Sequence, residues 1–249
     1  ELEQQRLFDT AAQSVVFIST ERGFGSGFFV ASDGRILTNA HVVEGADEVT
    51  VVLLDGRSTV GAVSERASDY DLAIVEVGDV GLPTIPLGIS HDGVRVGSWV
   101  ASIGHGRGGV WTYTTGMLSN RYSERGATAY QTQIPLNPGS SGGPVLDREG
   151  VAVGIVTAGM TGADGINFAI PTFEAVLSLD GLSDVCGCLA IHTNPGVPIF
   201  VDGELVGVGP KQRVHPSAGS HEVFAIVGGE KVVQTVKWPM PSGSVLELK

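Results

Sequence analysis

The chain has 249 residues, of which 42% are hydrophobic and 17% charged, a balance that indicates a packed globular protein and excludes extensive disorder. Its formal net charge of −12 and the absence of any Lys/Arg run argue against nucleic acid and anionic membrane surfaces as partners. No apolar run approaches the roughly 18 residues of a membrane span, so no membrane segment is predicted.

The predicted elements are mostly short strands. Thirty-six glycines without a collagen-like period indicate many tight turns. Hydrophobic spacing predicts a short amphipathic helix over residues 1–12, and a glycine turn over 23–27 follows the first strand. Alternating or apolar runs predict strands at 14–19, 28–30, 36–38, 49–54, 58–63, 72–77, 94–103, 112–119, 130–134 and 151–157. This pattern is typical of an all-β sandwich or barrel.

The C-terminal part has a different organisation. A second helix is predicted over 171–179, ending before Gly181. A short linker follows, and then a Gly/Pro-punctuated β pattern with strands expected at 191–201, 204–206, 222–227 and 231–236. We therefore expect one large domain over 1–182, a linker over 183–190 and a small β domain over 191–249.

The two cysteines, Cys186 and Cys188, stand one residue apart. A disulfide between them would close a small, strained ring, so a free pair and a bond to another chain stay open as alternatives. Two thiols are too few for a structural zinc site, and no metal is expected.

Residues 137–144 form the stretch Asn-Pro-Gly-Ser-Ser-Gly-Gly-Pro between two predicted strands. A tight surface turn is one interpretation. A glycine-lined loop also brings backbone N–H groups together and presents a hydroxyl on a sharp turn, which is what acyl transfer needs: a nucleophile beside donors for the developing oxyanion.

A histidine and an acid upstream favour the second interpretation. His41 follows an apolar strand-like run and a small-residue turn, and Asp71 stands at the start of another apolar run. The order His, Asp, Ser is the chymotrypsin-type order of a catalytic triad. Asp69 is a rival for Asp71, because both lie on the same face of an extended segment.

With these motifs the chain resembles the trypsin-like serine proteases, and within them the HtrA/Deg group. The resemblance rests on five ordered segments over roughly the first 180 residues, at 25–28, 38–43, 71–75, 137–144 and 165–171. It implies two six-stranded β-barrels of the chymotrypsin type, with the active site in the cleft between them, followed here by a small β-sandwich domain.

The resemblance also implies the roles of single residues. Ser141, which directly precedes Gly142-Gly143-Pro144, is the expected nucleophile, while Ser140 shapes the loop. His41 is the expected base, and Asp71 would fix the tautomer of its imidazole. The other histidines are expected to be structural or exposed; they are His91, His105, His192, His215 and His221.

The backbone N–H groups of Gly139 and Ser141 are the expected oxyanion hole. In this fold the strand after the nucleophile lines the primary substrate pocket, which assigns its wall to Ile155, Val156 and Thr157. No acid stands there to hold a Lys or Arg side chain. We expect cleavage after small or medium aliphatic residues.

Residues 193–203, followed by Gly207 and Pro210, resemble a PEGA domain, a small extracytoplasmic β module; a generic small β-sandwich is the alternative. The whole chain is thus predicted to be an extracytoplasmic serine endopeptidase of HtrA type that acts on unfolded or exposed protein segments without a cofactor. Relatives trimerise through N-terminal aromatic contacts, a part that Phe8 and Phe17 could play. The competing hypothesis is a catalytically silent protease fold that binds peptides or attaches to a surface.

Overall fold

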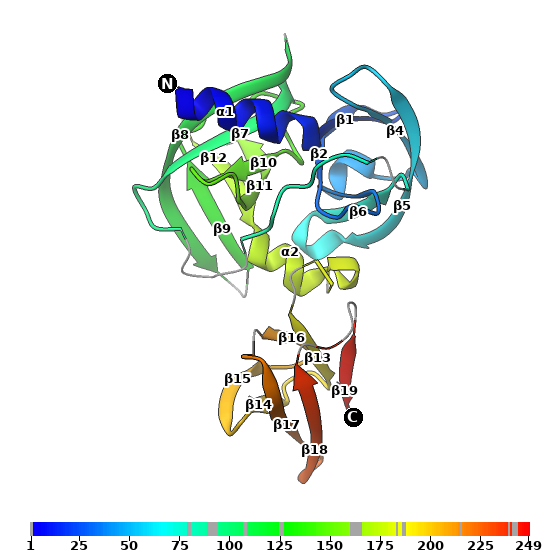
Figure 1. Cartoon of the computed structure of the whole chain (residues 1–249), viewed down its shortest axis with the longest axis vertical. Helices are drawn as coiled ribbons and strands as arrows, with labels where there is room; N and C mark the ends of the chain where they lie inside the picture. Colours follow the sequence, from blue (N-terminus) through cyan, green and yellow to red (C-terminus); the bar gives the residue numbers. More distant parts are fainter. Residues whose placement is uncertain are drawn as a thin grey trace. The chain divides into compact units, whose positions relative to one another are not determined.

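The computed structural model describes residues 2–78, 81–88, 94–106, 109–124, 127–159, 166–182, 184–185, 188–214, 216–238, 240 and 244–249. The chain divides into two compact units, Glu1–Leu179 and Asp180–Lys249, and each is described by itself (Figure 1). Of the predicted features, Cys186, His91 and His215 lie outside the described residues.

The first unit begins with helix α1 (Leu2–Ala11), close to the helix expected over 1–12. Its strands are β1 (Val15–Ser19), β2 (Phe24–Phe29), β3 (Arg35–Thr38), β4 (Glu48–Val52), β5 (Ser58–Ala67), β6 (Leu72–Glu76), β7 (Trp99–Gly106), β8 (Gly109–Glu124), β9 (Ala127–Thr132), β10 (Pro144–Leu146), β11 (Ala152–Gly159) and β12 (Asn167–Pro171). Short helices connect them: η1 (Ala12–Ser14), η2 (His41–Val43), η3 (Ser68–Tyr70) and, after β12, α2 (Thr172–Ser178).

These strands close into two six-stranded barrels, in the orders β1-β2-β3-β6-β5-β4 and β10-β11-β12-β9-β8-β7. Figure 1 shows the first barrel in blue to cyan and the second in green. Each barrel is filled by its own apolar side chains, such as Ile18, Ile36 and Val75 in the first and Val100, Ile134 and Val156 in the second. The predicted all-β fold with two six-stranded barrels is confirmed.

The predicted glycine turn over 23–27 is wrong for most of its length. Residues 24–27 belong to β2, which pairs with β1 from Phe24 to Phe28. The glycines are there because of close packing: a Cβ on Gly25 would lie 2.6 Å from the Val42 side chain, and one on Gly27 would lie 2.7 Å from Ile36.

Two strand predictions also need correction. Strand β7 begins at Trp99, whereas the apolar run predicted a start at 94; Val94 is buried in the barrel core without being part of a strand. Strand β8 covers Gly109–Glu124 and is longer than the expected 112–119, because it pairs with β7 along one part and with β9 along the other.

The second unit is a small β-sandwich. A three-stranded sheet has the order β16-β13-β19, and a four-stranded sheet has the order β15-β14-β17-β18. Side chains of both sheets share one core, including Ile191, Ile199, Val223 and Leu248. The elements are η4 (Asp180–Leu182), β13 (Leu189–Thr193), β14 (Pro198–Val201), β15 (Glu204–Val208), β16 (Lys211–Val214), β17 (Gly219–Val227), β18 (Glu230–Trp238) and β19 (Val245–Leu248).

Inside this unit the single strand expected over 191–201 is replaced by β13 and β14, because Asn194, Pro195 and Gly196 form a turn between them. Cys188, directly before β13, is disulfide-bonded.

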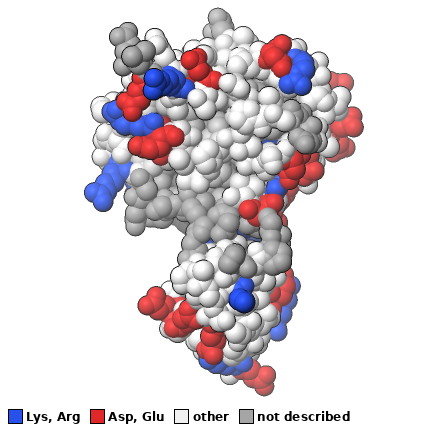
Figure 2. All heavy atoms as spheres, in the orientation of Figure 1, with Lys and Arg blue, Asp and Glu red and all other residues white. Residues whose placement is uncertain are grey.

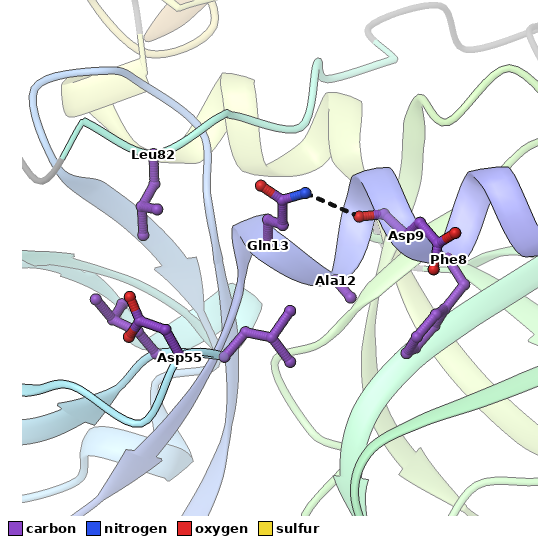
Figure 3. Close-up of a pocket in the computed structure, with 8 residues that line it drawn as sticks. Phe8, Asp9, Ala12, Gln13, Asp55 and Leu82 are labelled. Carbon is purple, nitrogen blue, oxygen red and sulfur yellow. Dashed lines mark hydrogen bonds between the residues drawn. The ribbon is translucent and has the colours of Figure 1, made fainter.

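A groove of about 350 Å³ lies where the end of α1 approaches the β4–β5 turn. Figure 3 shows Phe8, Ala12 and Leu82 on its sides, with the Gln13 amide donating to the Asp9 carbonyl oxygen at 3.1 Å. The residues predicted to be catalytic do not line it.

On the face drawn in Figure 2, acidic and basic side chains of the described residues are interspersed with uncharged surface. Within the part of the chain that the structure describes, no helix has the length and apolar character needed to cross a membrane.

Candidate active site

His41 stands at the start of η2, three positions after the last residue of β3. The two residues that follow, Val42 and Val43, are buried in the core of the first barrel and anchor the short helix. The imidazole itself is half exposed, with 48% of the side-chain surface accessible. It is therefore held by the barrel while its outer edge stays open to a ligand.

The structure brings His41 and Asp71 together. The imidazole Nδ1 lies 2.8 Å from Oδ2 and 3.0 Å from Oδ1 of Asp71, and the His41 backbone N–H donates to Oδ1 at 3.0 Å. These contacts orient the ring, since Nδ1–H faces the carboxylate and Nε2 faces away from it. Asp69, the rival acid, is exposed on η3.

Asp71 is fixed by residues of both barrels. The Thr157 hydroxyl on β11 donates to its Oδ2 at 2.8 Å, and the Asn39 amide donates to its backbone carbonyl at 2.9 Å. Its backbone is in the left-handed region, with φ of +54°. The carboxylate thus accepts bonds from His41 and Thr157 together.

These contacts set the pKa values of the pair. The hydrogen bond from Asp71 raises the pKa of His41 above its ordinary 6.5, with burial opposing and the charges of Asp71 and Glu44 adding to the shift. Burial alone would raise the pKa of Asp71, but the hydrogen bonds from His41 and Thr157 outweigh it and leave that pKa lowered. The pair therefore favours an ionised carboxylate beside the imidazole.

Ser141 lies in the loop between β9 and β10, and its hydroxyl points toward Thr157. The Oγ donates to the Thr157 carbonyl oxygen at 2.7 Å. Among the described residues, no hydrogen bond joins this hydroxyl to the imidazole of His41.

The loop around Ser141 is held by backbone bonds. Ser140 N–H donates to the Asn137 carbonyl at 2.9 Å, and Gly142 N–H donates to the Val156 carbonyl at 2.8 Å. Within the described part of the chain, the N–H groups of Gly139 and Ser141 donate to no protein acceptor. These are the two donors predicted to form the oxyanion hole; Gly139 is buried and Ser141 is partly exposed.

The three residues predicted to line the substrate pocket differ in how far they are exposed. Ile155 and Val156 are buried in the second barrel, with 0% and 2% exposure, so neither side chain presents surface. Thr157 is partly exposed, and its hydroxyl and carbonyl contact Asp71 and Ser141. The sequence did not predict the contacts of Thr157 with Asp71 and Ser141, nor the contact of Asn39 with Asp71.

A family model and several known proteins match the chain. The model of the trypsin-like peptidase domain matches residues 25–155, which span His41, Asp71 and Ser141. The chain belongs to the trypsin-like peptidases. The matched range begins within β2, includes the strands of the first barrel that follow it, and reaches the loop around Ser141 in the second.

Similar curated proteins are DegP-like. A periplasmic serine endoprotease of this type from Halomonas elongata is 43% identical over 168 residues, which are 65% of this chain and 35% of that protein. A protein named as the serine protease HhoB of Synechocystis is 42% identical over 159 residues, which are 61% of this chain and 38% of that protein. This trypsin-like peptidase thus spans little more than a third of the length of these relatives.

Solved structures share the fold. The serine endoprotease from Yersinia pestis superimposes with a TM-score of 0.64 at 22% identity, covering 94% of this chain and 96% of that one. The inactive form of a serine-to-alanine mutant of Rv3671c from M. tuberculosis has a TM-score of 0.61 at 26% identity, covering 70% of this chain and 89% of that one.

Proposed function

We propose that the chain is a serine endopeptidase of HtrA type that cleaves unfolded or exposed protein segments through a Ser-His-Asp acyl-enzyme mechanism. The observation that carries this proposal is the connected set of His41, Asp71, Thr157 and Ser141, in which both barrels contribute side chains. The DegP-like relatives, named as serine endoproteases, support the reaction class.

In the proposed mechanism, Ser141 Oγ leaves the Thr157 carbonyl and turns to His41 Nε2. His41 takes the hydroxyl proton while Oγ bonds to the substrate carbonyl carbon. The oxyanion accepts hydrogen bonds from the N–H groups of Gly139 and Ser141. His41 then gives the proton to the leaving amine as the peptide C–N bond breaks.

Water completes the cycle by attacking the acyl-enzyme ester. His41 takes a proton from the water, and the ester C–O bond breaks to return the hydroxyl to Ser141. Asp71 stays ionised throughout and stabilises the imidazolium that forms twice in each turnover.

The finer specificity is also proposed. Strand β11 carries no acidic residue, so no fixed charge there would hold a Lys or Arg side chain. We therefore expect cleavage after Val, Ala or Leu. Digestion of an unfolded protein, with cleavage sites located by mass spectrometry, tests this: a preference for basic residues would refute it. The Ser141→Ala variant should give no fragments.

The placement and the second unit belong to the same proposal. Relatives named periplasmic support an extracytoplasmic location. The β-sandwich of the second unit would act as a PEGA-like docking or regulatory module. Phe8 and Phe17, considered for a trimer contact, have ring neighbours within the first unit, Tyr113 and Phe24 respectively.

A peptide-binding protein without catalysis is the second candidate. The observation that favours it is the Ser141 hydroxyl bonded to Thr157 instead of His41. Proteolysis of the unfolded substrate by the wild type, absent in Ser141→Ala, would exclude it.

A further inference from the structure

A buried histidine without a part in the mechanism lies beside the loop over 137–143, which carries Ser141 and is called the nucleophile loop below. His105, on β7, is 1% exposed. Its ring is flanked edge to face by Trp111 at 4.5 Å and Phe17 at 5.4 Å between centroids. Its Nδ1 lies 3.0 Å from the hydroxyl oxygen of Ser26 on β2. This contact joins the two barrels.

Ser26 holds the nucleophile loop at two points. Its hydroxyl donates to the Gly139 carbonyl at 2.8 Å, and its backbone N–H donates to the Ser141 carbonyl at 2.8 Å. Thr38 fixes Ser26 in turn by donating to its carbonyl at 2.7 Å. Ser26 therefore forms hydrogen bonds with the carbonyl groups of both residues of the proposed oxyanion hole.

The protons around the Ser26 hydroxyl can be assigned by counting the hydrogen-bond donors and acceptors that contact its oxygen. The oxygen has one proton, which is used toward Gly139, because two oxygens at 2.8 Å with no proton between them would repel. The His105 backbone N–H donates to the same oxygen at 3.1 Å. The remaining lone pair of Ser26 Oγ then accepts from His105, which places the ring proton on Nδ1.

The other ring nitrogen agrees with this assignment. His105 Nε2 is buried and has no hydrogen-bond partner among the described residues. Burial lowers the pKa of His105 to about 4, so the ring is neutral near pH 7. An N–H group at Nε2 would be buried without an acceptor beside the aromatic rings. A lone pair at Nε2 without a donor has a smaller free-energy cost, which favours the proton on Nδ1.

The Gly139 carbonyl that Ser26 holds belongs to a tight turn. Pro138 and Gly139 are its central residues, Gly139 has φ of +104°, and Ser140 N–H closes the turn on Asn137. The bond from Ser26 to the Gly139 carbonyl holds the Gly139–Ser140 peptide, and so fixes the position of the turn next to Ser141. The φ of Gly139 sets the direction of its N–H within that turn.

We propose that His105 is a positioning residue, which donates its Nδ1 proton to Ser26 so that the Ser26 hydroxyl stays committed to the Gly139 carbonyl and keeps the oxyanion donors in place. This inference rests on the proposed function for its catalytic consequence. The proton assignment itself does not depend on catalysis, so the two can be tested apart.

The first test is an NMR measurement of the His105 tautomer in the full chain labelled with ¹⁵N-histidine near pH 7. The signals are assigned by their loss in His105→Asn. The expected result is a neutral ring protonated at Nδ1, opposite to the tautomer that free imidazole side chains prefer. A ring protonated at Nε2, or a charged ring, would overturn the proposal.

The second test is the rate at which a fluorophosphonate labels the serine. Ser26→Ala and His105→Leu should lower this rate by about 10- to 100-fold, because a misdirected oxyanion donor costs rate at the chemical step. KM for a peptide substrate should stay near its original value. His105→Asn should recover most of the rate, since its amide N–H can donate to Ser26.

The outcomes separate the two proposals. A labelled wild type with unchanged rates in Ser26→Ala and His105→Leu would refute the positioning role and leave the protease intact. An unlabelled wild type would refute the proposed function, while the tautomer measurement would still decide the proton assignment. Thermal unfolding of each variant shows which labelling rates come from folded protein. If His105→Leu does not fold, an unchanged rate in Ser26→Ala would still refute the positioning role, while the tautomer measurement decides the proton assignment.

Discussion

At the scale of single residues, the site depends on one carboxylate that accepts several bonds. Asp71 receives the His41 imidazole, the His41 backbone N–H and the Thr157 hydroxyl. Two of these donors belong to His41 beside the first barrel and the third to Thr157 on β11 of the second, so the carboxylate links the two barrels at the candidate site and orients the imidazole. Substitutions here should affect catalysis more than folding.

Asp71→Asn keeps the size of the side chain but offers an amide to Nδ1, which favours the wrong imidazole tautomer. We expect kcat to fall by roughly 10⁴-fold with a small change in KM. Asp69→Asn is the matched control on the exposed neighbour and should stay within about twofold of the wild type. Equal losses in both variants would contradict the assignment of Asp71.

Thr157→Val removes one hydroxyl of nearly equal size from the same carboxylate. A hydrogen bond to a charged group contributes about 1.5–3 kcal/mol, part of which is expressed when the imidazolium forms. We expect kcat to fall by about tenfold, measured on a peptide substrate. An unchanged kcat would mean that the contact serves packing alone.

The pH dependence follows from the raised pKa of His41. The base works only when neutral, so kcat/KM should fall as the pH drops through this pKa, with the midpoint above the ordinary value of 6.5. Removing the carboxylate charge in Asp71→Asn should move that midpoint to lower pH in a profile of kcat/KM against pH. A midpoint that stays in place would show that Asp71 does not set it.

At the scale of elements, the nucleophile loop depends on backbone conformation that only glycine accepts. Gly139 has φ of +104°, and a Cβ there would lie 2.0 Å from the His105 carbonyl oxygen. The N–H of the same residue is a proposed oxyanion donor. The loop's shape and its chemistry are therefore coupled at this position.

Gly139→Ala should force the loop to move and lower the serine-labelling rate by about 100-fold or more. Gly56→Ala is the matched control: its φ is +84°, but no atom lies within 4 Å of the added Cβ. That variant should lose about 1–2 kcal/mol of unfolding free energy from backbone strain and keep its labelling rate. Similar labelling in the two variants would contradict the role of the loop.

The main residues of the candidate site could be proposed from the sequence because they lie in local motifs. His41, Asp71 and Ser141 each stand next to an apolar run or a glycine turn that marks them in one dimension. The contacts of Thr157 with Asp71 and of His105 with Ser26 join residues 86 and 79 positions apart, and no spacing rule reaches that far. His105 was accordingly assigned only a structural or exposed role. Similarly, Gly25 and Gly27 suggested a turn, because close packing against Val42 and Ile36 is invisible in the sequence.

At the scale of the whole molecule, the two units have separate cores. The barrels bury one set of apolar side chains each, and the sandwich buries another that includes Leu189, Val236 and Leu246. The barrels themselves could be anticipated only through the family resemblance, since strand periodicity does not distinguish a barrel from a sandwich. The PEGA resemblance of the second unit stays a prediction.

Separate cores predict two unfolding transitions in calorimetry of the full chain. Covalent modification of Ser141 by a phosphonate should shift one transition and leave the other in place, because the label occupies the first unit only. The Ser141→Ala variant, treated in the same way, should show no shift. A single transition that moves as a whole would contradict two independent units.

The central claim is that Ser141 is the nucleophile, activated by His41 and Asp71. The most direct measurement is labelling with a fluorophosphonate probe, followed by mass mapping of the modified peptide, in the wild type, Ser141→Ala and Ser140→Ala. The account predicts a label on Ser141 in the wild type and in Ser140→Ala, and none in Ser141→Ala. A label on Ser140, or no label even with unfolded protein present, would contradict it.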